Sequence, residues 1–168
     1  MAVKALQFKT ISMLQGGADA FVQGQLSTLI NPSDGVGWMV KKIEMAFSTA
    51  LAAVSADFNV KYALSRLTKA AMPDYSADDV ILADGFSGSL TTSGQIVLPQ
   101  LISYDVPDGV LVVGDTLYAQ LDSDATALTI QAYMRIWYEE VRVTELEILR
   151  MIEQDAFSGG AGVVRIVP

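Results

Sequence analysis

Residues 127–143 read ALTIQAYMRIWYEEVRV, and this stretch decides the fold class of the chain. Apolar side chains occupy every second position from Leu128 to Tyr138, and more polar side chains occupy the positions between them. Such alternation is typical of a β-strand in an antiparallel sheet that buries one face. Strands average about five or six residues, so a strand of this length predicts a large sheet or a sandwich built around it.

The apolar side of this strand changes near its end. Val141 and Val143 fall on the opposite face from Leu128, so the pattern shifts at Glu139 and Glu140. We expect a β-bulge or a strong local twist at these two residues, where the strand leaves one environment for another.

Shorter alternating segments recur along the chain, separated by turn signals rich in Gly, Pro, Asn and Asp. Strands are expected at residues 20–30, 37–48, 58–64, 80–83 and 110–121, and residues 90–101 form either a strand or a hairpin around Thr92-Ser93-Gly94. Thr144 and Glu147 have the spacing of a capping box and open one short helix near residues 145–154. The prediction is an all-β fold, an antiparallel β-sandwich of jelly-roll type with about eight strands and a short C-terminal helix.

The connections between these strands are also predicted from local sequence. The turn NPSDG at residues 31–35 joins its two flanking strands into a hairpin. Glycines at 84–89 and the VPDG sequence at 106–109 predict two further turns. Gly114-Asp115 is interpreted as a bulge inside a single strand.

The two ends of the chain are expected to lie outside the sandwich, which with its helix would occupy residues 18–157. Residues 1–17 are weakly patterned and predict an N-terminal arm. Residues 158–168, SGGAGVVRIVP, join a Gly-rich hinge to an apolar strand-like segment. That segment either folds back as a last strand of its own sandwich or adds to the sheet edge of a neighbouring copy.

Composition excludes several classes of function. The net charge of −8 over 168 residues argues against a phosphate-binding surface, so no direct nucleic-acid binding is expected. The chain has no Cys and no His, which excludes disulfides and any zinc site or catalytic triad that needs them. No apolar run reaches the length of about 18 residues that predicts a transmembrane helix. The hydrophobic content of 51% indicates either an Ala- and Val-rich core or an additional interface.

The carboxylates do not form a catalytic pattern. Glu139 and Glu140 are adjacent on a strand, so their side chains point to opposite faces. The acidic pairs at 78–79 and 122–124 lie in expected turns, where Asp commonly bonds its own backbone. These turns offer oxygen ligands for Ca²⁺, but neither has the spacing of an EF-hand loop. The sequence therefore predicts no enzyme, no catalytic or metal-binding residue and no cofactor, with a Ca²⁺ ion at an Asp-rich turn as the alternative.

A candidate interface lies on the polar face of the long strand. Aromatic side chains share that face with an arginine, a combination typical of protein–protein hot spots, whereas Tyr138 belongs to the apolar face and the core. Burial under the C-terminal helix or the N-terminal arm is the alternative for the same pattern. Together with the apolar C-terminal segment, the candidate interface residues are Tyr133, Arg135, Trp137, Val163, Val164 and Ile166.

With this order of strands, the chain resembles the single jelly-roll coat proteins of icosahedral viruses over residues 18–143. The resemblance lies in the strand pair at 20–48, the strand at 58–66, the turn-rich centre and the closing strand, and no short diagnostic motif carries it. It implies a sandwich of two four-stranded sheets that contacts several neighbours in a shell. Coat proteins that wrap RNA commonly carry a basic N-terminal arm, whereas the first twenty residues here contain only Lys4 and Lys9 as cations. In that respect the chain is more similar to coat proteins of tailless bacterial or archaeal viruses that enclose a membrane or rely on other proteins inside.

The sequence thus predicts a structural capsid protein of the virion, assembled in the host cytoplasm from copies of itself and other capsid proteins. Symmetric repetition of modest interfaces would stabilise such a shell, and contact with an internal viral membrane is compatible with it. Two alternatives stay open. The first is a carbohydrate-binding or cell-surface adhesion sandwich, which needs an exposed line of aromatic side chains. The second is a phage decoration or baseplate accessory protein, which binds an existing particle.

Overall fold

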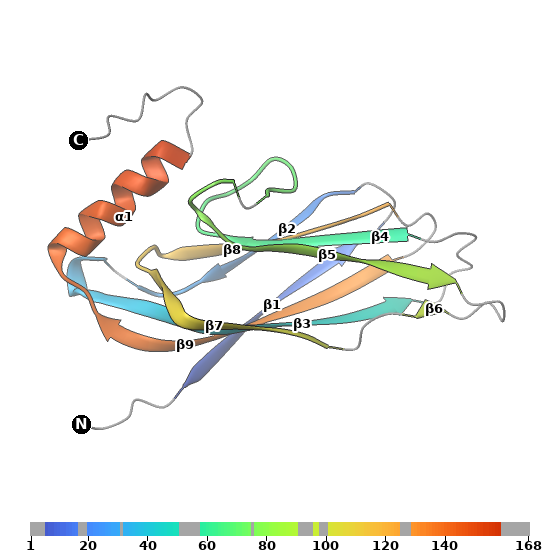
Figure 1. Ribbon diagram of the computed structural model, residues 1–168, viewed down its shortest axis with the longest axis horizontal. Helices are drawn as coiled ribbons and strands as arrows, with labels where there is room; N and C mark the ends of the chain where they lie inside the picture. The colour runs from blue at the N-terminus through green and yellow to red at the C-terminus, as the bar shows by residue number, and fades with distance from the viewer. Residues whose placement is uncertain are drawn as a thin grey trace.

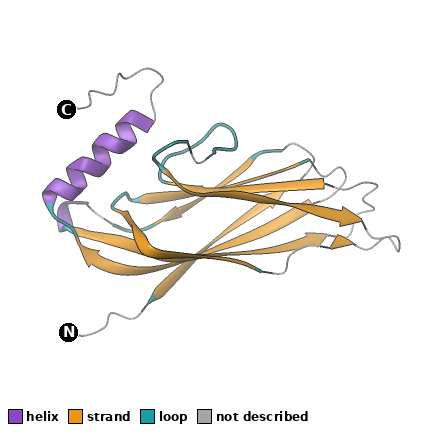
Figure 2. Ribbon diagram, viewed as in Figure 1, coloured by secondary structure: helices purple, strands orange, loops and turns teal. Residues whose placement is uncertain are grey.

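The computed structural model describes residues 6–16, 20–30, 32–50, 58–74, 76–90, 96–97, 101–124 and 129–158. Within them the chain forms two layers of strands with one helix at an end of the sandwich (Figures 1 and 2). The strands are β1 (Gln7–Gln15), β2 (Val22–Ser27), β3 (Val36–Ala50), β4 (Phe58–Ser65), β5 (Val80–Leu90), β6 (Ile96–Val97), β7 (Ile102–Val112), β8 (Thr116–Ser123) and β9 (Thr129–Arg142). A short 3-10 helix, η1 (Pro32–Asp34), precedes β3, and the helix α1 (Glu145–Ser158) follows β9.

The strand order is that of a jelly roll. One sheet has the order β1-β9-β3-β7 and the other the order β2-β8-β4-β5-β6, with antiparallel pairing throughout. The pairs are nested: β1 lies beside β9, β2 beside β8, β3 beside β7 and β4 beside β5. Such nesting results when one long antiparallel ribbon folds over into two packed sheets, which is the jelly-roll arrangement. The predicted all-β sandwich with a C-terminal helix is therefore confirmed.

β9 is the centre of this architecture, because it lies between β1 and β3 in the four-stranded sheet. Its inward side chains Ile130, Ala132, Met134, Ile136 and Tyr138 are at most 3% exposed. Full burial of a large apolar side chain stabilises a fold by roughly 1.5–3 kcal/mol. The apolar residues whose alternation predicts this strand are therefore the residues that β9 contributes to the core.

The expected irregularity at Glu139 and Glu140 is misplaced. β9 keeps a regular register with β3 from Tyr138 to Arg142, and the register shift lies on β3, between Val40 and Lys42. Glu140, two residues after the buried Tyr138, lines a pocket at this end of the sandwich, which accounts for a polar side chain at an inward position.

The turn predicted at 106–109 is wrong, since β7 runs through it. Val110 pairs with Val40 and Asp105 pairs with Lys42, so residues 106–109 lie opposite the single residue Lys41 as a large bulge. Pro107 has no amide hydrogen to donate to a ladder, and Gly109 has a φ of 75° that favours glycine. These two residues suit a bulge inside a strand as well as a turn between strands.

Two further connections cross between the sheets. β2 and β3 belong to different sheets, so the hairpin predicted across residues 31–35 is wrong. Leu29 and Gly35, with φ of 59° and 61°, redirect the chain on either side of η1. Gly114-Asp115 is likewise a link between β7 and β8 in opposite sheets, and the bulge predicted there is wrong.

Two predicted irregular segments are strands. The glycine-rich turn at 84–89 is part of β5, where Gly85 pairs with Lys61 of β4. A Cβ at Gly85 would lie 2.6 Å from the carbonyl oxygen of Val60, so glycine permits the close approach of the two strands. The prediction of an N-terminal arm is also wrong for residues 7–15. These residues form β1 and pair with β9 along their whole length.

The helix begins as the capping box predicts. The Thr144 amide donates to Glu147 Oε2 at 2.8 Å, and the Glu147 amide donates to Thr144 Oγ1 at 3.3 Å. The bond from the Thr144 amide, together with a second one from the Thr144 hydroxyl to the same oxygen, lowers the pKa of the Glu147 carboxyl. α1 ends at Ser158, four residues beyond its expected end, and among the described residues no helix is long and apolar enough to cross a membrane.

Candidate interface on the outer face of the four-stranded sheet

The registers of β1, β9 and β3 align their outward side chains in rows across the sheet. In one row Phe8 and Lys42 lie on either side of Trp137. In the next row Thr10 and Glu44 flank Arg135, and in a third Ser12 and Ala46 flank Tyr133. The three predicted interface residues of β9 therefore share one face, together with side chains from two strands that are distant in sequence.

Five of these side chains form an aromatic–ionic cluster, which we define as Phe8, Lys42, Glu44, Arg135 and Trp137. The Phe8 and Trp137 rings lie 4.8 Å apart, centroid to centroid, at an interplanar angle of 47°. The Arg135 guanidinium carbon lies 4.8 Å from the Phe8 ring centroid and 5.9 Å from that of Trp137. Both distances are within the range of a cation–π interaction.

Glu44 is the acceptor that holds this cluster together. Its Oε2 accepts a hydrogen bond from Trp137 Nε1 at 2.9 Å and lies 3.5 Å from Arg135 Nη1. Its Oε1 lies 2.8 Å from Lys42 Nζ. The hydrogen bonds from Lys42 and Trp137 lower the pKa of the Glu44 carboxyl against the opposing effect of burial, and the Lys42 bond raises the pKa of that ammonium. The carboxylate stays ionised and fixes the orientation of the indole.

The candidate interface residues differ in exposure. Tyr133 is 39% exposed and the Arg135 side chain is 47% exposed, whereas Trp137 is half-buried under Phe8. Trp137 is therefore partly buried, which the alternative interpretation of this face expected. The residue that covers it is Phe8 of β1, within the segment that was expected to form the N-terminal arm. Figure 1 shows α1 beyond the end of β9. The remaining candidates, Val163, Val164 and Ile166, lie outside the described residues.

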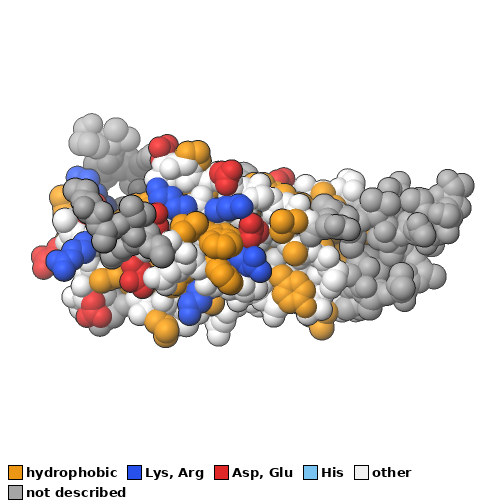
Figure 3. Space-filling model, turned by 90° about the horizontal axis from the view of Figure 1, so that it is seen from below, with side chains coloured by type: hydrophobic (Ala, Val, Ile, Leu, Met, Phe, Trp, Pro, Cys, Tyr) orange, Lys and Arg blue, Asp and Glu red, His pale blue; other side chains and the backbone are white. Residues whose placement is uncertain are grey.

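The strands of this sheet carry exposed apolar side chains, one of which, Phe8, belongs to the cluster. Phe8 and Leu14 of β1 are 50% and 59% exposed, and Leu101, just before β7, is 60% exposed. Figure 3 views the molecule from the side of this sheet and shows apolar side chains in the middle of the face, with basic and acidic side chains among them. Sequence alone pointed to the β9 residues of this face. Phe8, Lys42 and Glu44 were missed because only the strand registers bring them to it.

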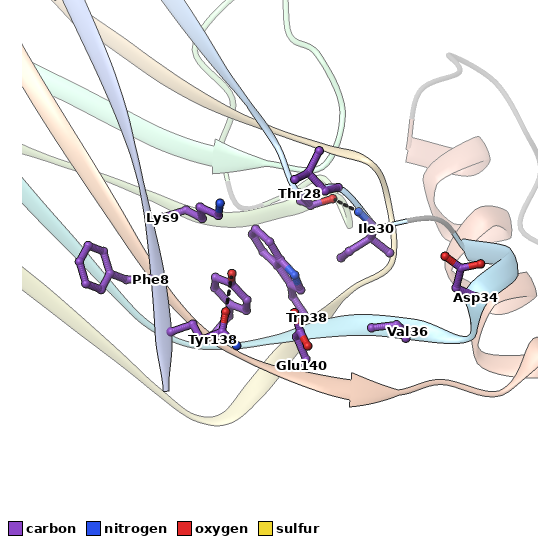
Figure 4. Close-up of a pocket in the computed structure, with 11 residues that line it drawn as sticks. Phe8, Lys9, Thr28, Ile30, Asp34, Val36, Trp38, Tyr138 and Glu140 are labelled. Atoms are coloured by element: carbon purple, nitrogen blue, oxygen red, sulfur yellow. Dashed lines mark hydrogen bonds between the residues drawn. The ribbon is translucent and has the colours of Figure 1, made fainter. Parts of the chain in front are cut away.

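A pocket of about 460 Å³ opens at the end of the sandwich near the start of β1 (Figure 4). Its floor contains the stacked rings of Trp38 and Tyr138, 3.7 Å apart at 13°. Trp38 is 3% exposed and is therefore a core residue. The Tyr138 hydroxyl donates to Gln7 Oε1 at 3.2 Å, and burial followed by the nearby Glu140 raises the pKa of the Tyr138 phenol. Glu140 lines this pocket beside the two rings, at the open end of the sandwich.

The aspartates of the predicted Asp-rich turns make contacts within the protein. Asp124 accepts hydrogen bonds from the Asn59 amide at 2.6 Å and from Asn59 Nδ2 at 2.9 Å, which lower the pKa of its carboxyl. Asp79 is buried and its Oδ1 lies 2.7 Å from Lys69 Nζ. In the described part of the chain no three His, Cys, Asp or Glu side chains gather as a metal site would require.

No known family model matches this sequence, and no curated protein sequence matches it. Among solved structures, the chain is similar to that of tomato aspermy virus at 12% identity and a TM-score of 0.47, covering 86% of this chain and 82% of that one. A structure of Desmodium yellow mottle tymovirus has 9% identity and a TM-score of 0.28, with coverages of 86% and 93%. A glycosylation-associated protein complex of Streptococcus agalactiae has 12% identity and a TM-score of 0.31, and this chain spans 26% of the matched chain. The jelly-roll assignment rests on the strand order of the chain itself.

Proposed function

We propose that this chain is a structural protein that assembles with copies of itself into the shell of a virion. The jelly roll serves viral capsid proteins, lectins and cupins alike, so the fold by itself leaves several functions open. The observation that carries the proposal is the outer face of the four-stranded sheet, where an ordered aromatic–ionic cluster lies among exposed apolar side chains.

The cluster has the physical properties of a protein-binding surface. Tyr, Trp and Arg are enriched at the centres of interfaces, and Tyr133, Arg135 and Trp137 lie side by side here. Contacts with Glu44 and Phe8 already restrict Trp137 and Arg135. Side chains that are ordered before binding lose less conformational entropy when a partner docks, so more of the contact energy remains as affinity.

The composition fits a shell subunit that does not hold nucleic acid directly. The net charge of −8 disfavours phosphate contacts and keeps isolated subunits soluble. Within the class of shell proteins, this acidic balance supports the type found in tailless bacterial or archaeal viruses that enclose a membrane. Modest interfaces, repeated by symmetry, are sufficient to stabilise such an assembly.

The experiment that tests this proposal is sedimentation velocity combined with electron microscopy of the purified protein. Assembled particles or closed oligomers are expected for the wild type. Tyr133→Glu places a charge at the centre of the outer face and should abolish them. Ala70→Glu is the matched control, because Ala70 is exposed on the loop between β4 and β5.

Two results would contradict the proposal. One is a wild-type protein that stays monomeric at every concentration tested, and the other is a Tyr133→Glu variant that assembles as the wild type does. A monomer that binds a saccharide on a glycan array would favour the carbohydrate-binding alternative. The structure offers that alternative limited support, because Phe8 and Arg135 contact the Trp137 ring that would have to stack on a sugar.

A decoration or baseplate protein would use the same outer face on an existing particle. The two assembly roles differ in one observable property. A shell subunit forms closed particles when purified alone, whereas an accessory protein stays small and binds only to preformed particles of another protein.

A further inference from the structure

β1 differs from the other sheet edges of the described chain. The opposite edge, β7, contains a bulge with Pro107 and carries Asp105 and Asp108. In the second sheet, the edge strands β2 and β6 have six and two residues. β1 has nine residues in unbroken register with β9, no Pro, and Lys9 as its one charged residue.

These differences matter because a free sheet edge offers unpaired backbone N–H and C=O groups to any other chain. Natural proteins block such edges with short strands, bulges, prolines and charges. β7 has a bulge, a proline and two charges, and β6 has two residues. β2 has no charge or proline but is three residues shorter than β1, whose one protecting feature is Lys9. No described strand pairs with the free edge of β1, which ends the sheet.

From Thr10 to Gln15 the side chains of β1 alternate between surface and core, whereas the residues from Gln7 to Lys9 are all exposed. Ile11, Met13 and Gln15 are at most 4% exposed. On the outer face, Phe8 and Leu14 are large, apolar and at least half exposed, and the exposed Thr10 and Ser12 lie between them. The outer row therefore reads Phe, Thr, Ser, Leu, which is close to a palindrome of chemical types.

We infer that β1 pairs with β1 of a second copy, antiparallel, across a two-fold axis at Ile11. The four-stranded sheets of the two copies would then join into one sheet of eight strands. This inference rests on the proposed self-assembly and names a second contact between copies, at the sheet edge beside the outer face. A two-fold contact is isologous, so the same strand serves both partners.

The register follows from side-chain chemistry. Residues that face each other in an antiparallel pair lie on the same side of the sheet, so the axis must pass through a residue. With the axis at Ile11, Phe8 of each copy lies opposite Leu14 of the other. Thr10 then lies opposite Ser12 of the second copy, a hydroxyl pair that is favourable between strands.

If the two-fold axis is moved by one or two residues, fewer of these side chains lie opposite a chemically similar partner. An axis at Thr10 places Phe8 opposite a serine, and an axis at Ser12 places Leu14 opposite a threonine. An axis at Lys9 places two ammonium groups opposite each other, which is destabilising. In the Ile11 register Lys9 lies opposite Met13 of the second copy, and the clusters of both copies belong to one continuous outer face.

Disulfide trapping tests this register directly, because the natural chain has no Cys. Full-length Thr10→Cys and Ser12→Cys proteins, distinguished by mass, are mixed and oxidised. Residues directly opposite in an antiparallel pair have Cβ atoms about 4.5–5.5 Å apart, a separation from which a disulfide forms with little movement. The mixed product, which joins a Thr10→Cys chain to a Ser12→Cys chain, is expected in several-fold excess over either product between identical chains.

A charge exchange provides the second test. Thr10→Glu with Ser12→Glu places two pairs of carboxylates opposite each other across the axis. Thr10→Glu with Ser12→Lys places two opposite-charge pairs there and keeps the same Glu beside Arg135 of its own chain. The first variant should dimerise about tenfold more weakly than the wild type, and the second should stay within about threefold of it.

The outcomes separate this inference from the proposed function. A protein that assembles, but gives no excess of the mixed disulfide and no difference between the charge variants, overturns the β1 contact and leaves self-assembly standing. A chain that stays monomeric overturns both. The mixed disulfide together with the charge rescue supports the two-fold contact at Ile11.

Discussion

The two faces of β9 differ in composition, exposure and contacts, although they alternate residue by residue along one strand. The inner face, from Ile130 to Tyr138, is apolar and at most 3% exposed. The outer face carries Tyr133, Arg135 and Trp137, and the contacts of Arg135 and Trp137 are aromatic and ionic. This difference separates two tasks: the inner face holds the sandwich together, and the outer face remains available to other molecules. Substitutions on the two faces should therefore change different measurable properties.

The largest effect is expected on the inner face. Met134→Ala removes a fully buried side chain and leaves a cavity, so the free energy of unfolding should fall by about 2–5 kcal/mol in urea denaturation. Tyr133→Ala, one position earlier and 39% exposed, is the matched control and should cost much less. Equal losses for the two variants would remove the distinction between the faces.

A smaller loss of unfolding free energy is expected from a substitution of Glu44, which bonds the charged and aromatic side chains of the outer face. Glu44→Gln removes the charge that holds Lys42, Arg135 and the Trp137 indole. Because hydrogen bonds to charged groups contribute about 1.5–3 kcal/mol each at most, we expect a loss of roughly 1–2 kcal/mol and a changed near-ultraviolet signal from Trp137. An unaltered tryptophan signal would show that Glu44 does not orient the indole.

The pH dependence of the same residue gives a further prediction. The pKa of Glu44 is lowered in the folded protein, so its contribution to stability is present above its ordinary value of 4.5. That contribution is lost as the pH falls through the lower pKa of the folded state. The difference in unfolding free energy between wild type and Glu44→Gln should therefore be constant near neutral pH and shrink below about pH 4.5. A difference that grew on acidification would contradict the assigned direction.

The smallest effect on the sandwich is expected from the helix, which lies outside both faces of β9. Thr144→Ala removes the capping box and should destabilise the first turn of α1 by about 1 kcal/mol. Amide exchange in that turn should accelerate about fivefold, while exchange in β9 stays unchanged. Faster exchange in β9 would show that the helix cap supports the sandwich.

The difference between the faces also explains what could be predicted from sequence. Alternation is a local property, so β9, its core side chains and the shared face of Tyr133, Arg135 and Trp137 all follow from one segment. Phe8 and Glu44 reach the cluster only through pairing with residues more than ninety positions away. No local pattern specifies which distant strand becomes the neighbour.

Glycine and proline caused the main errors in the strand map. Gly85 and Pro107 have the composition of turns, yet each lies inside a strand. The reason for Gly85 is the backbone of β4, whose Val60 carbonyl would clash with a side chain there. Pro107 and Gly109 lie in a bulge opposite Lys41. In each case the residue that explains the glycine or proline lies on a neighbouring strand, so local sequence propensity could not predict the structure.

In the proposed assembly, copies of this chain meet through the outer face of the four-stranded sheet. Hydroxyl-radical footprinting of the wild type, dilute and assembled, tests it most directly, because it measures the accessibility of individual side chains. Phe8, Leu14 and Tyr133 should become protected on assembly, while Leu149 on α1 stays as reactive as in the dilute protein. Protection of Leu149 with unchanged reactivity at Phe8, Leu14 and Tyr133 would contradict the claim.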